Sequence, residues 1–336
     1  MNKIGILGAG TWGTAIAILL ADNGHDVTIW SKLEKEIRAL EESRENIKNL
    51  PGASLPEQVK TTTDLEAACI DKDIIVLAVA SPFTRVISKE TSPFIKEGQI
   101  IVNVSKGLEN GTLLTLADVI KQEIPQAEVA VMSGPSHAEE VSRRIPTTIV
   151  VGSSCKKTAN FIQDVFMNEV FRVYTSPDII GIELGGALKN VIALAAGIID
   201  GLGLGDNTKA ALMTRGLAEI SRLGIKMGGC METFSGLSGI GDLFVTCTSQ
   251  HSRNRNAGVL IGQGYPMDEV AKKVNQAIEG VNTAKAALKL AQKYDIEMPI
   301  AEQINLVLFE GKSAKDAVAD LLVRDKRKEY TTLSWD

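Results

Sequence analysis

The chain has 336 residues, 44% of them hydrophobic and 23% charged, which is typical of a globular protein with room for two domains. Its net charge of -5 argues against nucleic-acid binding and against a broad contact with anionic membranes. The four cysteines stand far apart and without metal-ligand spacing, so we expect reduced thiols, no metal and a cytoplasmic location. The first residues lead directly into a strand and a glycine loop, which leaves no room for a signal peptide.

The first half of the chain alternates short apolar runs with helical patterns, as is typical of a doubly wound parallel sheet. Most runs are continuously apolar, so helices should cover both faces of the sheet. We expect strands over residues 4–7, 27–30, 74–79, 100–104, 129–132, 148–151 and 170–173. We expect helices over residues 12–23, 33–44 and 113–122.

After residue 178 the strand-like runs stop and long helical patterns begin. We expect helices over residues 179–199, 208–227, 254–263, 267–274, 281–294 and 299–309. A turn signal at residues 176–178 coincides with this change and predicts a domain boundary. Residues 1–177 should form a Rossmann-type dinucleotide-binding domain, and residues 178–336 an all-α substrate-binding domain. The charged run 324–330 is interpreted as a solvated tail.

A Gly-x-Gly-x-x-Gly motif, formed by Gly8, Gly10 and Gly13, follows the first expected strand and opens a helix. In such a motif the first glycine permits a tight turn, the second lets a pyrophosphate approach the backbone, and the third lets helix and strand pack closely. The helix start, at Thr11 and Trp12, offers free N–H groups and the positive end of the helix dipole. The motif therefore predicts dinucleotide binding rather than a purely structural turn.

The end of the second expected strand bears on the choice of cofactor. An acidic residue there would bind the ribose 2′-hydroxyl of NAD. The chain instead places Lys32 there, which favours the 2′-phosphate of NADP, although Glu34 is close enough to supply a carboxylate. The sequence therefore leaves NADP and NAD open.

Three further loops, at residues 80–83, 105–107 and 133–138, follow expected strands, where an open α/β sheet binds its ligand. Lys106 stands directly after a buried strand, which favours a ligand contact over a solvated loop cation. The third loop is small and rich in hydroxyl groups, so it can donate hydrogen bonds to substrate or nicotinamide. His137 in this loop is a candidate general acid, but a single histidine in a turn is more often structural.

Lys189 lies in the middle of an apolar segment, residues 179–199, whose only other charge is Glu183. A lysine and glycines at mid-segment favour a core helix over a membrane span. Burial of a lone ammonium is costly, so this lysine needs a partner, a lowered pKa or a functional role. Its helical neighbours include Gly185, Gly186 and Gly197, a stripe of small residues that would leave a groove for a ligand. A close helix crossing explains the segment equally well, so the segment alone leaves both interpretations open.

Two later segments carry polar groups suited to a phosphorylated substrate. Asp242 follows three glycines, which allow close backbone approach. Ser252 is a natural N-cap, and Arg253 and Asn254 open the helix that follows, where a phosphate would bind well. Taken alone, the segment from Ser252 to Asn254 is typical of a capped surface helix. Together with a dinucleotide-binding fold and Lys189, it favours a phosphorylated small substrate.

The segments GAGTWG, NVSKGLE, SGPSHAEEV, ELGGALKN, GLSGIGDL and SRNRNAG together resemble the bacterial NAD(P)-dependent glycerol-3-phosphate dehydrogenase family over essentially the whole chain. The resemblance implies reversible reduction of dihydroxyacetone phosphate to sn-glycerol 3-phosphate by NADH or NADPH, feeding phospholipid synthesis. It also implies that Lys189 donates and accepts the proton.

The resemblance implies a set of site residues as well. The implied substrate contacts are Lys106, Gly134, Ser136, Lys189, Asp242, Ser252, Arg253 and Asn254. The implied dinucleotide contacts, beside Gly8, Gly10 and Gly13, are Thr11, Trp12, Lys32, Lys106, Ala138, Arg253, Ala277 and Glu279. The chain departs from the family where Thr11 replaces the common Ser, Lys32 the frequent Arg or His, and Ala277 the usual Val.

Proton transfer in both directions near neutral pH requires a lowered lysine pKa. We expect enclosure and the nearby Lys106 to lower the pKa of Lys189 by roughly 2 to 3 units from about 10.4. We expect Asp242 and Asn190 to orient the ammonium.

Two alternatives stay open at this point. Lysine-dependent β-hydroxyacid and 6-phosphogluconate dehydrogenases resemble a Gly-x-x-x-Lys-x-x-x-Asn pattern, whereas this chain has Ala193 in the last place and the asparagine directly after the lysine, at Asn190. A dinucleotide-sensing protein without chemistry would retain the fold but not the polar residues. The apolar helical faces also allow a homodimer.

Overall fold

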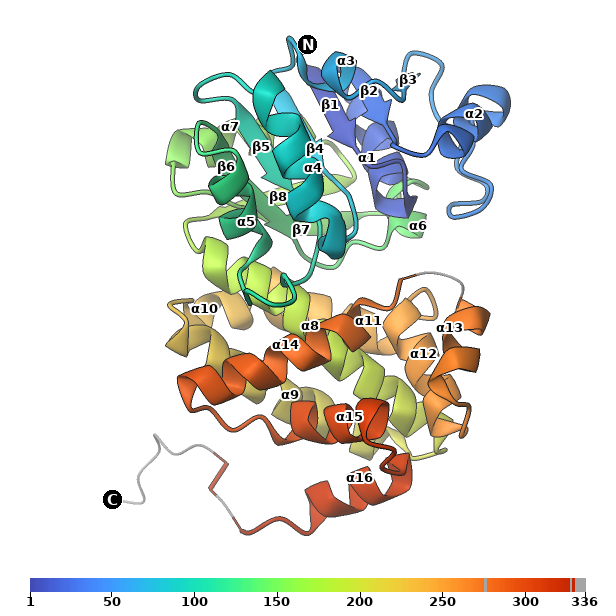
Figure 1. Cartoon of the computed structure of the whole chain (residues 1–336), viewed down its shortest axis with the longest axis vertical. Coiled ribbons are helices and arrows are strands. Elements are labelled where there is room, and N and C mark those ends of the chain that lie inside the picture. Colours follow the sequence, from blue (N-terminus) through green and yellow to red (C-terminus); the bar gives the residue numbers. More distant parts are fainter. Residues whose placement is uncertain (275–276, 327, 330–336) are drawn as a thin grey trace.

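The computed structural model describes residues 1–274, 277–326 and 328–329, so part of the charged run 324–330 lies outside the described residues. The chain forms a sheet-containing part followed by a helical part (Figure 1). The strands are β1 Lys3–Leu7, β2 Asp26–Trp30, β3 Lys60–Thr62, β4 Ile74–Leu77, β5 Ile100–Asn103, β6 Glu128–Ser133, β7 Thr147–Gly152 and β8 Phe171–Ser176. They form one sheet in the order β3-β2-β1-β4-β5-β6-β7-β8.

Helices cover both faces of this sheet, as the continuously apolar strands predict. Residues of α1, α6 and α7 belong to the apolar core on one face, and residues of α3, α4 and α5 to the core on the other. The helices of this part are α1 Thr11–Asp22, α2 Glu34–Ser43, α3 Leu65–Cys69, α4 Thr84–Thr91, α5 Leu116–Glu123, α6 Ala138–Val141 and α7 Lys156–Phe166, with 3₁₀ turns η1 Ser81–Phe83 and η2 Ser92–Phe94. The expected Rossmann-type architecture is confirmed.

The sheet departs from the expected all-parallel arrangement at one pair of strands. β7 runs antiparallel to β6, while the other paired strands are parallel. The connection from β6 to β7 contains only the four-residue helix α6. Residues 134–146 hold no other helix or strand, and β7 runs back along β6 from the end at which β6 stops.

After β8 the described residues form helices and loops, in agreement with the expected helical second half. The helices are α8 Ile179–Gly201, α9 Asp206–Lys226, α10 Met231–Phe234, the π-helix η3 Leu237–Gly241, α11 Asp242–Thr248, α12 Arg253–Gly262, α13 Met267–Val274, α14 Glu279–Tyr294, α15 Pro299–Phe309 and α16 Ala314–Leu322. Helix α8 runs through the middle of this part, with α9, α12 and α14 packed around it (Figure 1).

Helix α8 is the one described helix that is long and apolar enough to cross a membrane. Its most apolar stretch is 94% buried inside the protein, so it has the environment of a core helix. Its start is capped by Asp178, whose side chain accepts the N–H of Gly181 at 2.8 Å.

The glycines of α8 allow close packing instead of leaving an open groove. A Cβ on Gly185 would lie 2.4 Å from the carbonyl oxygen of Ser238, and a Cβ on Gly197 would lie 2.0 Å from that of Arg255. A Cβ on Gly258 of α12 would in turn lie 2.1 Å from the carbonyl oxygen of Leu194. Of the two interpretations left open by the sequence, the close helix crossing describes this stripe: α8 and its neighbours cross in backbone contact, and Lys189 is enclosed by that crossing.

Candidate active site

Lys189 lies at the middle of α8 and is only 5% exposed. Its Nζ donates hydrogen bonds to Oδ1 of Asp242 and, at 2.6 Å, to Oγ1 of Thr246. Asp242 begins α11 and is 1% exposed. A buried ammonium is thus held by a buried carboxylate, which is the pairing that such a cation requires.

The network continues into the sheet-containing part. Lys106, in the loop after β5, donates to Oδ2 of Asp242 at 2.7 Å and to the carbonyl oxygen of Gly134 at 3.0 Å. The hydroxyl of Ser136 donates to the same carbonyl oxygen at 3.0 Å. Because β5 and β6 are parallel, the loops after them meet at one edge of the sheet, which faces α8 and α11. Lys106, Gly134, Ser136, Lys189 and Asp242 are therefore brought together across the junction of the two parts.

Burial and the neighbouring charges shift the pKa values of Lys189 and Asp242. Burial lowers the pKa of Lys189 to about 7, with Asp242 opposing the shift and Lys106 adding to it. This matches the direction and the causes expected from the sequence. Burial alone would raise the pKa of Asp242, but Lys106 and Lys189 outweigh burial and hold the pKa below its usual value.

Thr246 is a member of the network that the sequence reasoning missed. Its hydroxyl accepts from Lys189 and donates to the carbonyl oxygen of Asp242 at 2.6 Å, one helical turn earlier. The signal was the spacing of four residues from Asp242, which places both side chains on one face of a helix. The sequence analysis noted only the three glycines before Asp242 and did not predict α11.

Asn190 does not orient the ammonium as expected. Its Oδ1 accepts from Nδ2 of Asn254 at 3.0 Å, and Oδ1 of Asn254 accepts from the N–H of Gly280 at 2.8 Å. Asn190 therefore ties α8 to the starts of α12 and α14. Orientation of Lys189 comes instead from Asp242 and Thr246.

The start of α12 has the form expected of an anion-binding helix end. Ser252 is its N-cap, and its Oγ accepts the N–H of Arg255 at 3.2 Å. Arg253 is exposed and Asn254 is buried. The Asn254–Asn190 contact joins this helix start to the residue that follows Lys189 in α8.

The glycine motif fits a bound pyrophosphate. Gly8 has a φ of 122°, and a Cβ there would lie 2.6 Å from the carbonyl oxygen of Ala78. A Cβ on Gly13 would lie 1.9 Å from the carbonyl oxygen of Gly8. Gly10 differs, since a Cβ there would meet no described atom within 4 Å. Packing within the protein thus does not require glycine at this position, and the open space at the start of α1 suits a phosphate group.

Lys32, just after the end of β2, forms an ion pair with Glu90. Nζ of Lys32 lies 2.7 Å from Oε1 of Glu90 on α4, and both side chains are exposed. Glu34, considered as a ribose ligand, pairs instead with Arg38 one turn along α2 at 2.6 Å. The described contacts do not join Lys32 to the Lys189 network. It lies instead near the glycine motif, two residues after Trp30, whose carbonyl oxygen accepts the N–H of Gly8 at 2.9 Å.

A second contact joins the two parts near α14. The hydroxyl of Ser81, in the loop after β4, donates to Oε2 of Glu279 at 2.7 Å. Burial raises the pKa of Glu279, while Ser81 and Arg253 act in the opposite direction. Ala277 is exposed shortly before Glu279, and Ala138 is buried at the start of α6.

His137 is enclosed beside the network rather than bonded into it. Its Nε2 is buried without a hydrogen-bond partner among the described residues, and its ring centroid lies 5.8 Å from that of His251. Burial, then Lys189 and Lys106, lower the pKa of His137 to about 4. The imidazole is therefore neutral near pH 7, which argues against a role as general acid.

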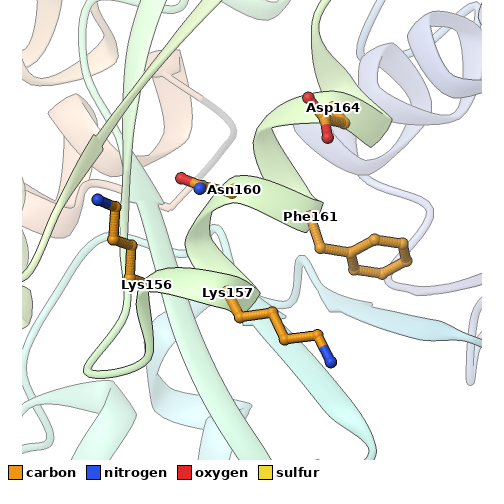
Figure 2. A pocket seen from close by; sticks show the side chains of 5 residues that line it. All are labelled: Lys156, Lys157, Asn160, Phe161 and Asp164. Carbon is orange, nitrogen blue, oxygen red and sulfur yellow. The ribbon is translucent and has the colours of Figure 1, made fainter.

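A shallow hollow elsewhere on the surface does not belong to this site. It is lined by Lys156, Lys157, Asn160, Phe161 and Asp164, all on α7 (Figure 2). The two lysines point in different directions, and no member of the Lys189 network lines the hollow.

The two parts of the chain each match one half of a known family. The profile described as the NAD-dependent glycerol-3-phosphate dehydrogenase N-terminus matches residues 3–159, and the one described as its C-terminus matches residues 178–319. The chain belongs to this family. The resemblance noted from the sequence motifs is confirmed, and assignment to the β-hydroxyacid or 6-phosphogluconate dehydrogenases is excluded.

Full-length relatives within the glycerol-3-phosphate dehydrogenase family agree with this assignment. A protein named glycerol-3-phosphate dehydrogenase [NAD(P)+] from Agathobacter rectalis is 61% identical over 335 residues, covering 100% of both chains. The protein of that name from Bacillus subtilis is 50% identical over 336 residues, covering 99% of this chain and 97% of the relative. Because these alignments span both parts of the chain, they support one function for the whole molecule.

Solved structures place the fold in the same family. The crystal structure of glycerol-3-phosphate dehydrogenase from Coxiella burnetii is 39% identical with a TM-score of 0.93, covering 96% of this chain and 99% of that one. A D-mandelate dehydrogenase structure has a TM-score of 0.64 at 13% identity and shows a shared fold alone.

Proposed function

We propose that the protein catalyses the reversible NAD(P)H-dependent reduction of dihydroxyacetone phosphate to sn-glycerol 3-phosphate. The observation that carries this proposal is the buried Lys189–Asp242 pair at the junction of two parts that both match the family. The test is to follow NADPH and NADH absorbance with dihydroxyacetone phosphate and with a panel of 3-oxo acids. Oxidation only with the panel would contradict the proposal, and no oxidation with any compound would favour a non-catalytic sensor.

In the proposed mechanism Lys189 acts on the substrate oxygen. A dinucleotide held by the motif Gly8–Gly13 would supply the hydride to the carbonyl carbon. Negative charge then grows on the carbonyl oxygen, where the Lys189 ammonium stabilises it and donates a proton. Asp242 and Thr246 hold Nζ in place, and Lys106 adds positive charge to the same enclosed space. Enclosure strengthens each of these interactions because water is excluded.

We propose that the two parts divide the binding between them. Residues 1–177 hold the dinucleotide, through the motif Gly8–Gly13 with Thr11 and Trp12, and through Lys32, Lys106 and Ala138. Residues 178–336 hold the substrate through Lys189, Asp242, Ser252, Arg253 and Asn254, with Lys106, Gly134 and Ser136 added from the first part. Arg253, Ala277 and Glu279 complete the dinucleotide site from the second part.

A Gly10→Ala substitution should separate dinucleotide binding from folding. The added Cβ meets no described atom within 4 Å, so the melting temperature should stay close to that of the wild type. The same Cβ occupies the space proposed for pyrophosphate, so the KM for NADPH should rise about tenfold or more. Gly13→Ala is the contrasting variant, because its Cβ would clash with Gly8 and cost about 1–3 kcal/mol of stability. An unchanged KM in the Gly10 variant would remove this glycine from the dinucleotide site.

An Arg253→Ala substitution should mainly weaken substrate binding. We propose that its guanidinium, Asn254 and the start of α12 hold the substrate phosphate. A hydrogen bond between charged groups contributes about 1.5–3 kcal/mol, so the KM for dihydroxyacetone phosphate should rise about 10- to 100-fold. Steady-state kinetics with saturating dinucleotide measure this effect. A loss confined to kcat would contradict the phosphate role.

The two directions of the reaction should respond oppositely to pH. Reduction needs protonated Lys189 and oxidation needs the neutral amine, and the pKa of Lys189 lies at about 7. The kcat for reduction should therefore fall above about pH 7, and the kcat for oxidation should fall below it. Profiles of kcat at saturating substrate in both directions provide the measurement. Parallel profiles in the two directions would contradict the role of Lys189.

We further propose a cytoplasmic enzyme whose product feeds glycerophospholipid synthesis, without nucleic-acid binding or membrane insertion. Four free cysteines and the burial of α8 support this setting. Both NADP and NAD are proposed as cofactors, since Lys32 suits a 2′-phosphate but is paired with Glu90. A homodimer is proposed on the apolar helical faces, and light scattering at several protein concentrations tests it.

A further inference from the structure

Glu183 is a buried carboxyl group that the mechanism above does not use. It lies on α8 and is 7% exposed. Its Oε1 accepts the backbone N–H of Ala117 at 2.9 Å, near the start of α5. Its Oε2 is buried and makes no hydrogen bond with the described residues, although the Thr115 hydroxyl lies close enough to the carboxyl group to lower its pKa. A buried oxygen without a partner is costly, so this atom calls for a proton, a water molecule or both.

A small cavity lies beside Glu183 and reaches the Lys189 network. Its lining includes Asn103, Ser105, Lys106, Ser133 and Glu183. The space for the centre of a water-sized sphere is about 10 Å³, close to what a single water molecule needs. The polar groups around it are sufficient to hold one water by several hydrogen bonds.

The cavity shares two residues with the site. Lys106 donates to Asp242, and the hydroxyl of Ser133 donates to Oδ2 of Asp242 at 3.4 Å. The other oxygen of Asp242 accepts from Lys189. A chain of polar groups therefore runs from Glu183 through one water position, Ser133 and Asp242 to the ammonium of Lys189.

We propose that Glu183 holds a proton inside the protein and returns it to Lys189, through one buried water and Ser133, after each reduction. After reduction Lys189 is a neutral amine. The carboxyl O–H of Glu183 then breaks as a new O–H forms on the water. The water passes a proton to the Ser133 hydroxyl, whose own proton moves to Oδ2 of Asp242. Rotation of that carboxyl group then turns the new O–H toward the amine, which accepts the proton. The end state is a Glu183 carboxylate and a Lys189 ammonium, and solvent later reprotonates Glu183.

The charges around Glu183 support this assignment, which rests on the proposed function. Lys106 faces it from the loop after β5, and Asp118 and Lys121 face it from α5. Burial is the largest cause and raises the pKa of Glu183 to about 7. Asp118 adds to this shift, while the Thr115 hydroxyl, the Ala117 N–H and Lys121 oppose it, so the carboxyl group keeps its proton up to neutral pH. The pKa of Lys189 is also about 7, so moving a proton between the two groups costs little free energy.

The test is Glu183→Gln, with Glu219→Gln as the matched control. Gln keeps the shape and can still accept from Ala117, but it cannot release a proton. Glu219 is likewise buried, accepts the N–H of Ile300 at the start of α15, and has its pKa raised by burial to about 7. It lies in the helical part and is not a member of the Lys189 network. Any effect of losing a buried, helix-capping carboxylate is therefore common to both variants.

The kcat for dihydroxyacetone phosphate reduction and its solvent deuterium isotope effect are the readouts. In the Glu183 variant kcat should fall about tenfold, less than the loss of the proton donor itself would cause, while KM should stay within about twofold. The solvent isotope effect should rise, because proton return becomes rate-limiting. The Glu219 variant should match the wild type in all three.

A second variant guards against misfolding of the first. Ser133→Ala interrupts the chain of groups without touching the contact with α5, and it should also raise the solvent isotope effect. An unchanged kcat and solvent isotope effect in the Glu183 variant would overturn the relay, as would equal changes in the Glu219 variant. If Glu183→Gln does not fold, an unchanged isotope effect in Ser133→Ala overturns it. A wild-type protein that does not reduce dihydroxyacetone phosphate would instead overturn the proposed function.

Discussion

We expect Lys189→Ala to lower kcat/KM for dihydroxyacetone phosphate reduction by about 10⁴-fold or more. The substitution removes both the charge that stabilises the growing alkoxide and the proton that neutralises it. Each of these effects is worth about 10²-fold or more in enzymes. Lys189 is 5% exposed and enclosed by α8 and α11, so water does not readily replace the missing ammonium.

Dinucleotide affinity should change little in the same variant. The glycine motif at Gly8–Gly13 belongs to the other part of the chain, and no described hydrogen bond joins it to Lys189. Quenching of tryptophan fluorescence by NADPH measures this affinity, since Trp12 stands within the motif. Lys209→Ala is the control, because Lys209 also pairs with a partly buried aspartate, Asp200, but outside the network. Turnover retained in the Lys189 variant would remove this residue from the chemistry.

The sequence predicts most of the fold because apolar patterning reflects burial directly. The apolar runs in β1, β4 and β5 predicted these strands to within about two residues of the observed bounds. β3 has the sequence Lys60-Thr61-Thr62 at the edge of the sheet, so it carries no apolar run and was not predicted. The direction of β7 was wrong because it depends on the path of the chain between β6 and β7, which patterning of the strand does not record.

The site was predicted less completely than the fold. Motifs single out Lys106, Lys189 and Asp242, and the structure joins all three by hydrogen bonds. The role expected for Asn190 failed because neighbours on a helix point in different directions, so Asn190 faces α12 instead of the ammonium. Thr246 was missed because it becomes a neighbour of Asp242 only once α11 is known.

The glycines of α8 show why one pattern supports two interpretations. Small residues beside a buried lysine suit either a ligand groove or a close helix crossing. Which interpretation holds depends on the segment that packs against the glycines. That segment is distant in the sequence, as Arg255 is from Gly197. Sequence periodicity shows which residues share one face of a helix, but it does not show which segment packs against that face. Only the three-dimensional structure distinguishes a ligand groove from a helix crossing.

We expect Asp242→Asn to impair both catalysis and stability, since one carboxylate holds two cations. Asn keeps the shape of the side chain but removes the negative charge between Lys106 and Lys189. Repulsion between the two ammonium groups is then unopposed, so the pKa of Lys189 should fall further below its usual value. Less of the lysine is protonated at neutral pH, and kcat for reduction should drop about 100-fold.

The pH profile distinguishes this cause from a general loss of structure. In the variant the fall in kcat for reduction should begin at a lower pH than in the wild type, because Lys189 loses its proton earlier. Stability should drop by about 3 kcal/mol, as for other broken buried ion pairs, which denaturant unfolding measures. Asp200→Asn is the control, because Asp200 on α8 also pairs with two cations, Lys209 and Arg255. That control should lose stability without moving the pH profile, and an unshifted profile in the Asp242 variant would show that Asp242 does not set the pKa of Lys189.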